Sequence, residues 1–492
     1  MNRILSSAAL TAMAAALAAC TTVGPDYTVP KDAVVQRDAA RAPFMGAAEA
    51  SYTSEPLPAD WWHLYQDPVL DRLVTKAFAA NADLRVAAAN LQRAHAVLEE
   101  VEEKKRPEVE MSVAPQYGRI AGASLGIPEQ LPRTGLYEGD IKVAYQVDMW
   151  GRIKRAIEAA EADRDAAQAA ADLAHVMVAA DTTRAYADAC SAGYQLKVAQ
   201  DSVDLQGRFV KLTAERARRG RGIAIDNSRA QAQFELLRAN LPPLEARRRT
   251  ALYRLAVLTG EVPSGFPADV AQCATPPRVL AAVPVGDGAA LLRRRPDVRQ
   301  AERQLAGATA RIGVATAELY PSISLGASIG AVGMMKQFGD NDTYKFSLGP
   351  LIAWNLPATS SARVHIAQSK ANTAGALARF DAVVLNALRE TESALTVYAR
   401  ELDRNAALRA ARDQSALASR QTAKLYEFGR SDFLSSLDAD RTLASAEGML
   451  AASDAQLAAD QVQLFLALGG GWENTHAAHG EGEHMAHAGN TK

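Results

Sequence analysis

The sequence predicts a mainly helical chain with a membrane β-barrel part, built from a duplicated unit of helix, strand pair, long helix and helix. Three observations give this prediction. The two halves carry similar motifs in the same order, four short segments alternate apolar with polar residues, and two long stretches contain no proline. A duplicated unit with one strand pair predicts four strands per chain.

The composition supports long helices and gives no sign of a nucleic-acid partner. The chain has 492 residues, of which 48% are apolar but only 6% aromatic. Alanine supplies much of the apolar share, which favours closely packed helices over a bulky globular core. Lys and Arg number 54 against 56 Asp and Glu, so no excess of positive charge is available to bind phosphates.

The N-terminal segment 1–19 has the features of a secretory signal peptide that is cleaved. A short apolar run, too short to span a bilayer, ends in Leu17-Ala18-Ala19-Cys20 and is followed by polar sequence. This ending resembles the bacterial lipobox, which implies palmitate-type lipidation of Cys20 and a lipidated, extended segment at residues 20–59. Thr21 in place of Asp permits transport to the outer membrane. An ordinary signal peptide with an incidental cysteine is the alternative.

Matched spacings reveal the internal repeat. Pro107 follows Asp83 at the same separation in sequence as Pro321 follows Asp297. The separation from Gly220 to Gly260 likewise equals that from Gly429 to Gly469. We therefore expect repeats at residues 60–260 and 290–470, joined by a linker at 261–289 and followed by a His-rich flexible tail at 471–492.

The four alternating segments have the length and pattern of transmembrane strands, with apolar side chains on one face and polar side chains on the other. Their expected bounds are 108–119, 138–149, 322–333 and 343–354. Aromatic residues that suit the membrane interfaces lie in or near them: Tyr117, Tyr137, Tyr145, Trp150, Tyr320, Tyr344 and Trp354. A soluble two-faced sheet would show the same alternation and is the alternative.

Four strands cannot close a membrane barrel, because known barrels need about eight or more. Lipid also tolerates no open sheet edge. If the strands span a membrane, several chains must therefore share one barrel.

The proline-free stretches predict two helices of unusual length. Each covers about 70 residues, which corresponds to roughly 100 Å of helix. Apolar and small residues recur along both at steps of three and four, as in supercoiled helices. In the first stretch this stripe includes Cys190, which we expect to be a buried thiol; a disulfide with Cys273 is left open. A long soluble coiled coil is the alternative for the helices, but it does not explain the strands.

Several motifs occur in a fixed order along nearly the whole mature chain. They are Cys20-Thr21-Thr22-Val23-Gly24-Pro25-Asp26-Tyr27, Asp60-Trp61-Trp62, Tyr145-Gln146-Val147-Asp148-Met149-Trp150-Gly151-Arg152, Leu292-Arg293-Arg294-Arg295-Pro296-Asp297-Val298, Tyr426-Glu427-Phe428-Gly429 and Leu437-Asp438-Ala439-Asp440-Arg441. With the duplication, they resemble the outer-membrane factor family, in particular the NodT-like lipoprotein branch of RND-type multidrug efflux channels.

The resemblance implies a homotrimer whose four strands per chain form a twelve-stranded barrel in the outer membrane, continuing into a long periplasmic α-helical barrel. It implies a passive conduit in a tripartite efflux system that carries drugs or other small molecules to the exterior. The expected partners are a periplasmic adaptor, an inner-membrane RND-type pump and outer-membrane lipid. Neither a cofactor nor enzyme activity is expected.

The resemblance also implies functional residues at the far tip of the helices. The turns at Gly220 and Gly429 would contact the adaptor, while also ending their helices as ordinary glycine caps. Leu434, Asp438 and Arg441 would form the pore gate, with Asp226 as a weaker candidate from the first repeat. The alternative for Asp438 and Arg441 is a surface ion pair worth under about 1 kcal/mol.

Other motifs indicate no further chemistry. Two matches to the nucleophile-elbow pattern, at residues 122–126 and 326–330, lack the strand–turn–helix context that this motif requires. The tail holds four histidines, which give either a disordered polar segment or a speculative metal site: His476, His479, His484 and His487. Two rival functions share parts of the pattern, namely a duct for type I protein secretion and a non-conducting envelope coiled-coil lipoprotein.

Overall fold

The computed structural model describes residues 22–49, 51–119, 121, 126, 128–130, 132–220, 222–354 and 359–472. It divides into two compact units. The described residues up to Pro30, together with 90–168 and 300–380, form the first, which we call the strand unit. The described remainder, 31–89, 169–299 and 381–472, forms the second, the helical unit.

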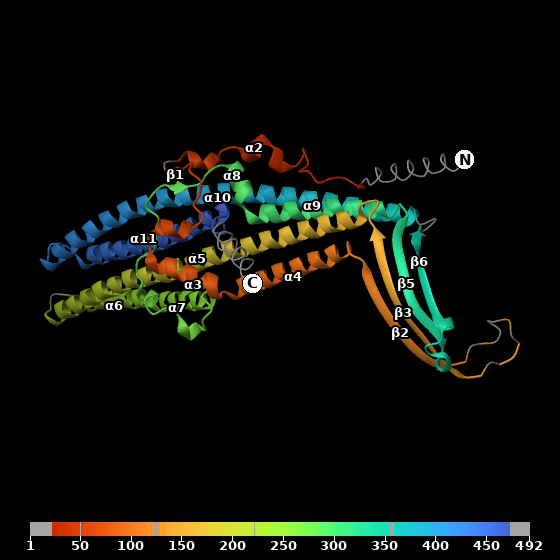
Figure 1. Ribbon diagram of the computed structural model, residues 1–492. Helices are drawn as coiled ribbons and strands as arrows, with labels where there is room; N and C mark the ends of the chain where they lie inside the picture. The colour runs from red at the N-terminus through yellow and green to blue at the C-terminus, as the bar shows by residue number, and fades with distance from the viewer. Residues whose placement is uncertain are drawn as a thin grey trace, which may run out of the picture. The chain divides into compact units, whose positions relative to one another are not determined.

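The strand unit contains one antiparallel sheet of four strands (Figure 1). They are β2 (Glu108–Gly118), β3 (Thr134–Val147), β5 (Ser322–Met334) and β6 (Tyr344–Ala353), in the order β2-β3-β5-β6. Strands of this length suit a bilayer. The second strand begins at Thr134 rather than near residue 138, because its first residues continue the ladder by pairing with the end of β2, down to Thr134 opposite Gly118.

Helices lead into and away from this sheet. The leading helices are α4 (Ala82–Glu103) and α9 (Pro296–Ala317), and both have 22 residues. The departing helices are α5 (Arg152–Arg218) and α10 (Thr359–Glu427), with 67 and 69 residues. Within the strand unit α4 packs on α5 through Leu98, Ile153 and Ile157. The matched lengths follow the duplication seen in the sequence.

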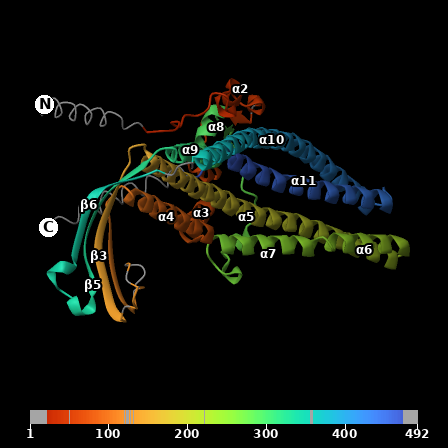
Figure 2. The ribbon, with the colours of Figure 1, turned by 90° about the vertical axis from the view of Figure 1, so that its right-hand side faces the viewer.

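The helical unit contains the far parts of α5 and α10 and the helices that return beside them (Figures 1 and 2). In the first half the return consists of α6 (Ala224–Arg238) and α7 (Leu241–Leu258). In the second half it is one helix, α11 (Phe433–Leu468). The first return is interrupted because Pro242 and Pro243 lack the amide hydrogens that a continuous helix needs, so they occupy the first turn of α7.

Short elements complete the helical unit. They are α2 (Asp38–Arg41), α3 (Pro68–Ala80), α8 (Gly288–Arg294), and the strands β1 (Tyr52–Thr53) and β4 (Val283–Pro284), which pair in parallel. Its core surrounds Trp61, which is fully buried and stacks on Phe465 with ring centroids 4.7 Å apart. The Trp61 indole also donates a hydrogen bond to the Gly470 carbonyl at 3.2 Å. The Asp-Trp-Trp motif therefore fastens the N-terminal segment to the end of α11.

The linker between the repeats is held on both sides. Cys273 forms a disulfide with Cys190 of α5, so the expected buried thiol at Cys190 is wrong. Gly193 lies so close that a Cβ there would sit 2.1 Å from the Cys273 carbonyl oxygen. On the other side the Gln461 side chain of α11 accepts from the Val279 amide at 3.0 Å and donates to its carbonyl at 3.2 Å.

None of the helices in the described ranges combines the length and the apolar character needed to cross a bilayer.

Candidate functional site: a membrane sheet and a helical tip

One face of the sheet is apolar, and every charged residue of the strands lies on the other face. In the cross-strand register Val109 faces Val143 and Val143 faces Ala327, so one apolar face runs across the strands. Its large side chains are exposed in the single chain, as Phe346 at 86% and Leu348 at 84% show. All charged residues of the four strands lie on the other face: Glu108, Glu110, Glu138, Asp140, Lys142 and Lys345.

The charged face contains an ion-pair cluster. Lys345 Nζ contacts a carboxylate oxygen of Glu138 at 2.6 Å and one of Asp140 at 3.0 Å. Asp140 lies flat on the sheet because the neighbouring strand has Gly330, where a Cβ would come within 2.4 Å of its carboxylate. The cluster therefore joins β3 to β6 across β5.

Both outer strands of the sheet have a free edge. Among the described strands, β2 pairs only with β3 and β6 pairs only with β5. Each outer edge therefore presents unpaired amide and carbonyl groups along the length of its strand. Backbone groups of this kind cannot face lipid, so a sheet with an apolar face and two free edges requires another chain at each edge.

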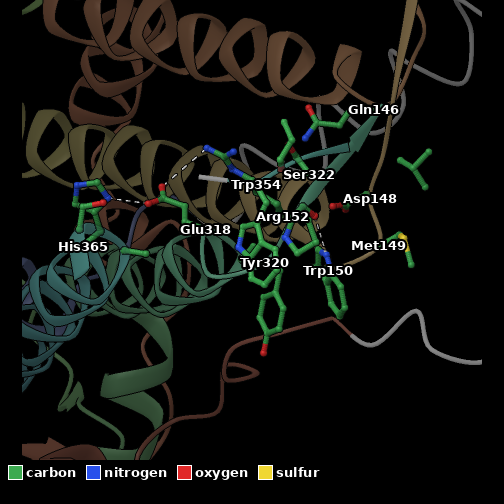
Figure 3. Close-up of a pocket in the computed structure, with 16 residues that line it drawn as sticks. Gln146, Asp148, Met149, Trp150, Arg152, Glu318, Tyr320, Ser322, Trp354 and His365 are labelled. Atoms are coloured by element: carbon green, nitrogen blue, oxygen red, sulfur yellow. Dashed lines mark hydrogen bonds and ion pairs between the residues drawn. The ribbon is translucent and has the colours of Figure 1, made fainter. Parts of the chain in front are cut away.

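Aromatic residues mark the end of the sheet nearest the long helices (Figure 3). Trp150 stacks on Tyr320 with centroids 4.4 Å apart and donates from Nε1 to the Pro321 carbonyl at 3.0 Å. They line a cavity of about 340 Å³, whose rim includes Trp354. In the same cavity a carboxylate oxygen of Glu318 lies 2.7 Å from the Nδ1 atom of His365. Stacked aromatic rings such as these suit the boundary between lipid and water.

The segment after the predicted lipid anchor docks beside these aromatics. The Val23 amide donates to the Trp150 carbonyl at 3.1 Å. The buried guanidinium of Arg155 donates to the carbonyls of Val23 and Gly24, each at 3.1 Å, and to the carboxylate of Asp26 at 2.8 Å. Gly24 has φ +87°, and a Cβ there would lie 2.4 Å from the Gly313 Cα, so this position accepts only glycine. The motif at residues 22–27 is therefore a docking strap.

At the far end of the helical unit the two helix pairs meet in an aromatic cluster. We call it the tip cluster; it contains Phe209, Tyr426, Phe433 and Leu437. Phe433 stacks on Phe209 with centroids 5.6 Å apart. The Arg216 guanidinium lies 4.4 Å from the Tyr426 ring centroid and donates to the Tyr426 carbonyl at 2.7 Å. Burial raises the pKa of Tyr426, and Asp226 adds to the rise while Arg216 opposes it.

The predicted gate residues lie on one exposed face of α11, close to the tip cluster. Leu434 is 54% exposed, and Asp438 and Arg441 are exposed as well. Arg441 Nε donates to Gln233 of α6 at 2.8 Å, and within the described chain neither Arg441 nor Asp438 takes part in an ion pair. Asp438 and Arg441 therefore do not pair with each other within one chain. The weaker candidate, Asp226, lies half-buried at the start of α6.

The two predicted tip turns have the geometry of glycine caps. Gly220 and Gly429 have φ of +69° and +70°, and a Cβ added at either position would meet no atom within 4 Å. Their repeat partners Gly260 and Gly469 also have positive φ, at +75° and +70°. The matched glycine spacing therefore arises because each of these glycines ends a helix, two in each repeat.

Some predicted residues fall outside the described ranges. Cys20 and the tail histidines are among them, as is most of the first nucleophile-elbow match, while the second match lies inside β5. In the part of the chain that the structure describes, no group of three His, Cys, Asp or Glu side chains could hold a metal ion.

Sequence reasoning missed Arg155 and the tip cluster. A signal for Arg155 was available in the sequence, because a charged side chain on an alanine-rich, buried helix face needs a partner. Phe209 and Phe433 gave none, because each is a single aromatic residue far from the other in sequence.

These features define a class: a subunit of an outer-membrane β-barrel channel that also contains long helices. The family model described as outer membrane efflux protein matches residues 73–261 and 289–470. The chain belongs to this family. The family consists of channels, which agrees with the expected role as the outer-membrane channel of an efflux system.

Similar proteins agree with this assignment. Nodulation protein T of Rhizobium leguminosarum bv. trifolii is 28% identical over 453 residues, covering 92% of this chain and 94% of that protein. The probable efflux pump outer membrane protein TtgC of Pseudomonas putida is 29% identical and covers 96% of each chain. The solved structure of the outer-membrane channel OprN superposes with a TM-score of 0.85 at 32% identity, covering 92% of this chain and 99% of that one.

The comparisons confirm the predicted family, outer-membrane location and fold class. The fold is that of trimeric efflux channels, in which a barrel is joined to a helical tunnel.

Proposed function

We propose that three copies of this chain form a passive conduit through the outer membrane, without a catalytic step of its own. The main support for this proposal is that both outer strands of the sheet have a free edge. Three sheets joined edge to edge supply twelve strands, with the apolar face toward lipid and the charged face toward the lumen, and no edge is left in the bilayer.

A lipid anchor at Cys20 fits the docking strap. Cys20 lies three residues before Val23, and an extended chain covers at most about 10 Å over that distance. Val23 is hydrogen-bonded to Trp150, one of the aromatic residues at the end of the sheet. Acyl chains on Cys20 would therefore enter the leaflet whose boundary these aromatic residues mark.

The exposure of Leu434, Asp438 and Arg441 beside the tip cluster supports a gate at this end of the helices. Leu434, Asp438 and Arg441 would close the lumen by contacts between subunits, with a weaker contribution from Asp226. The glycine turns at Gly220 and Gly429 are open on their outer side, which suits docking of a periplasmic adaptor. The adaptor would connect the conduit to an inner-membrane RND-type pump, which supplies the energy for export of drugs or other small molecules.

Single-channel conductance in planar bilayers tests this proposal. The purified protein should run as a trimer in detergent and show small or rare openings. The double variant D438A/R441A should raise the conductance severalfold, because the proposed contacts between subunits are lost. A matched control, D403A/R404A, removes an exposed acid and base from α10 away from the tip and should leave conductance unchanged.

The outcomes separate the parts of the proposal. A monomer in detergent, or a trimer without conductance in either form, contradicts the conduit. A conducting trimer whose conductance responds equally to both double variants contradicts only the assignment of the gate.

A further inference from the structure

The disulfide of the helical unit joins two cysteines that differ in their access to solvent. Cys190 lies in the interior of α5, is fully buried and belongs to the core around Trp61. Cys273 follows the short 3-10 helix Val270–Gln272 in the linker and is partly exposed. A thiol reagent or a partner protein can therefore reach the Cys273 sulfur, whereas the core covers the Cys190 sulfur.

Open space lies on the Cys273 side of the disulfide. A cavity of about 310 Å³ is bounded by Ala271, two residues before Cys273, and by Leu196 of α5. Leu252 and Phe266 give this cavity an apolar wall. It leaves room for a segment of another protein beside the linker, close to the exposed end of the disulfide.

Gly193 determines how closely the linker approaches α5. A Cβ at this position would lie 2.1 Å from the Cys273 carbonyl oxygen and 3.5 Å from the Ala274 Cα, so the linker backbone rests directly on the glycine. Cys190 and Gly193 are three residues apart and share one face of the helix. Seating of the linker on Gly193 therefore brings Cys273 to Cys190, and their Cα atoms are 4.8 Å apart.

We propose that this chain is a substrate of a periplasmic thiol oxidase, with Cys273 as the cysteine that enters the reaction and Cys190 as the cysteine that completes it. The oxidase is defined by its chemistry, as a protein with an exposed and reactive disulfide. An outer-membrane protein folds after export to the periplasm, a compartment in which disulfides form and persist. The proposal concerns maturation of the chain and does not depend on the conduit.

The oxidation consists of two exchange steps. In the first, the Cys273 thiolate attacks one sulfur of the oxidase disulfide, that bond breaks, the other oxidase sulfur leaves as a thiolate, and a mixed disulfide forms. In the second, the Cys190 thiolate attacks the Cys273 sulfur, and the first oxidase sulfur leaves as a thiolate. The two protons lost by the cysteines are taken up by the two oxidase thiolates. The chain gives up two electrons, and the oxidase disulfide becomes a dithiol.

Packing sets the order of these steps. A reaction that starts at Cys190 requires the oxidase to reach a sulfur that the core covers. In the proposed order Cys190 never meets the oxidase, because it attacks the Cys273 sulfur that the seated linker delivers to it.

Single-cysteine variants test which thiol is accessible. C190S leaves Cys273 and C273S leaves Cys190, and each is treated as the assembled trimer with an aromatic disulfide that releases a coloured thiolate. C190S should react about tenfold faster or more, because its thiol is at the surface. C190S/C273S supplies the blank for any other thiol. Equal rates, or a faster reaction of C273S, would overturn the assignment of the entering cysteine.

A purified oxidase with a Cys-X-X-Cys disulfide tests the reaction itself. C190S should form a covalent adduct with the oxidase that persists on non-reducing gels, because the cysteine that completes the reaction is missing. C273S should form none, and the reduced wild-type chain should pass through the adduct and emerge oxidised. An adduct with C273S in place of C190S, or with neither variant, contradicts the proposal.

The glycine seat has its own test. G193A retains both cysteines but holds the linker away from α5, so its adduct with the oxidase should persist as in C190S. The matched control G448A changes a glycine of α11 whose added Cβ meets no atom within 4 Å, and it should oxidise at the wild-type rate. Oxidation of G193A at that same rate would show that the second step does not need the seat, and would leave the entering cysteine to the other two tests. Conductance is not a readout in any of these experiments, so failure of the conduit would not alter their results.

Discussion

The two halves of the repeat share their backbone path but differ in how their returning helices are buried. The leading helices are equal in length and the long helices are nearly so. In contrast, α6 buries only Ala230 among its described residues, whereas α11 buries a stripe along its whole length, ending in Leu464, Phe465 and Leu468. In the first half the other buried residues of the return lie on α7, namely Ala251, Leu252, Leu255 and Ala256. Duplication has kept the path of the chain, while burial along the return is continuous only in the second half.

This difference predicts that the second half holds the first in place at the tip. Phe433 of α11 inserts against Phe209 of α5, and both are at least nine-tenths buried. Residues of the first half would therefore lose their packing when the second half is truncated, rather than the reverse.

The largest expected effect comes from F433A. Removing a buried phenylalanine typically costs about 3–5 kcal/mol, because a cavity is left behind. We expect proteolysis at the tip turns of both halves and a leaky channel in bilayers. The control F428A, at a position 77% exposed, should change neither. Cleavage confined to the second half would show that the halves are held independently.

Replacement of the disulfide probes the second link between the halves. The linker is bound covalently to α5 in the first half but by hydrogen bonds and the Arg278–Asp454 pair to α11 in the second. The bridge closes a separation of 83 residues, and bonds of this kind contribute about 2–4 kcal/mol. C190S/C273S should lower the melting temperature of the trimer, as measured by loss of trimer on heating.

A reducing agent supplies the matched control for that variant. It should lower the melting temperature of the wild-type protein and leave that of C190S/C273S unchanged. Equal responses of both proteins would show that the disulfide does not stabilise the linker.

Much of the architecture follows from local patterns in the sequence. Four strands could be predicted because alternation has a fixed period of two. The register then brought the alternating apolar positions of all four strands onto one face, while Val332, Met334 and Leu351 lie on the charged face. The matched spacing of Gly220 and Gly260 with Gly429 and Gly469 could be used because a left-handed helix end requires glycine. Helix length followed from the absence of proline.

Contacts between distant residues could not be predicted in this way. Nothing near Cys190 indicates that Cys273 lies beside it, since pairing depends on how the linker folds back on α5. Arg155 binds backbone carbonyls of Val23 and Gly24, and carbonyls have no sequence signature. The intrachain partner of Arg441 is Gln233 rather than Asp438 because α6 lies beside α11, which no local pattern specifies.

The starts of the two returning helices also differ, with a smaller expected effect. Asp432 caps α11 by accepting from the Ser435 amide at 2.8 Å, and this hydrogen bond lowers the pKa of its carboxyl group. The residue at the same place before α6 is Ile223, which provides no side-chain cap. D432A should speed amide hydrogen exchange in the first turn of α11 severalfold, while I223D should slow it in α6. Unchanged exchange in D432A would mean that tertiary packing alone holds this helix start.

The smallest expected effect concerns Asp440, which α11 places half-buried near the tip cluster. Burial raises the pKa of this carboxyl group, and the hydrogen bond donated by Ser419 at 2.7 Å only partly opposes the rise. An acid with a raised pKa in the folded state destabilises the fold at higher pH, and the penalty disappears as the pH falls through that raised pKa. D440N keeps the acceptor for Ser419 without the charge. It should raise the melting temperature by about 1–2 °C at pH 8, and the gain over wild type should vanish as the pH approaches 4. An increase in melting temperature that is independent of pH would instead assign the effect to packing. A buried charge would then not be a difference between α11 and the returning helices of the first half.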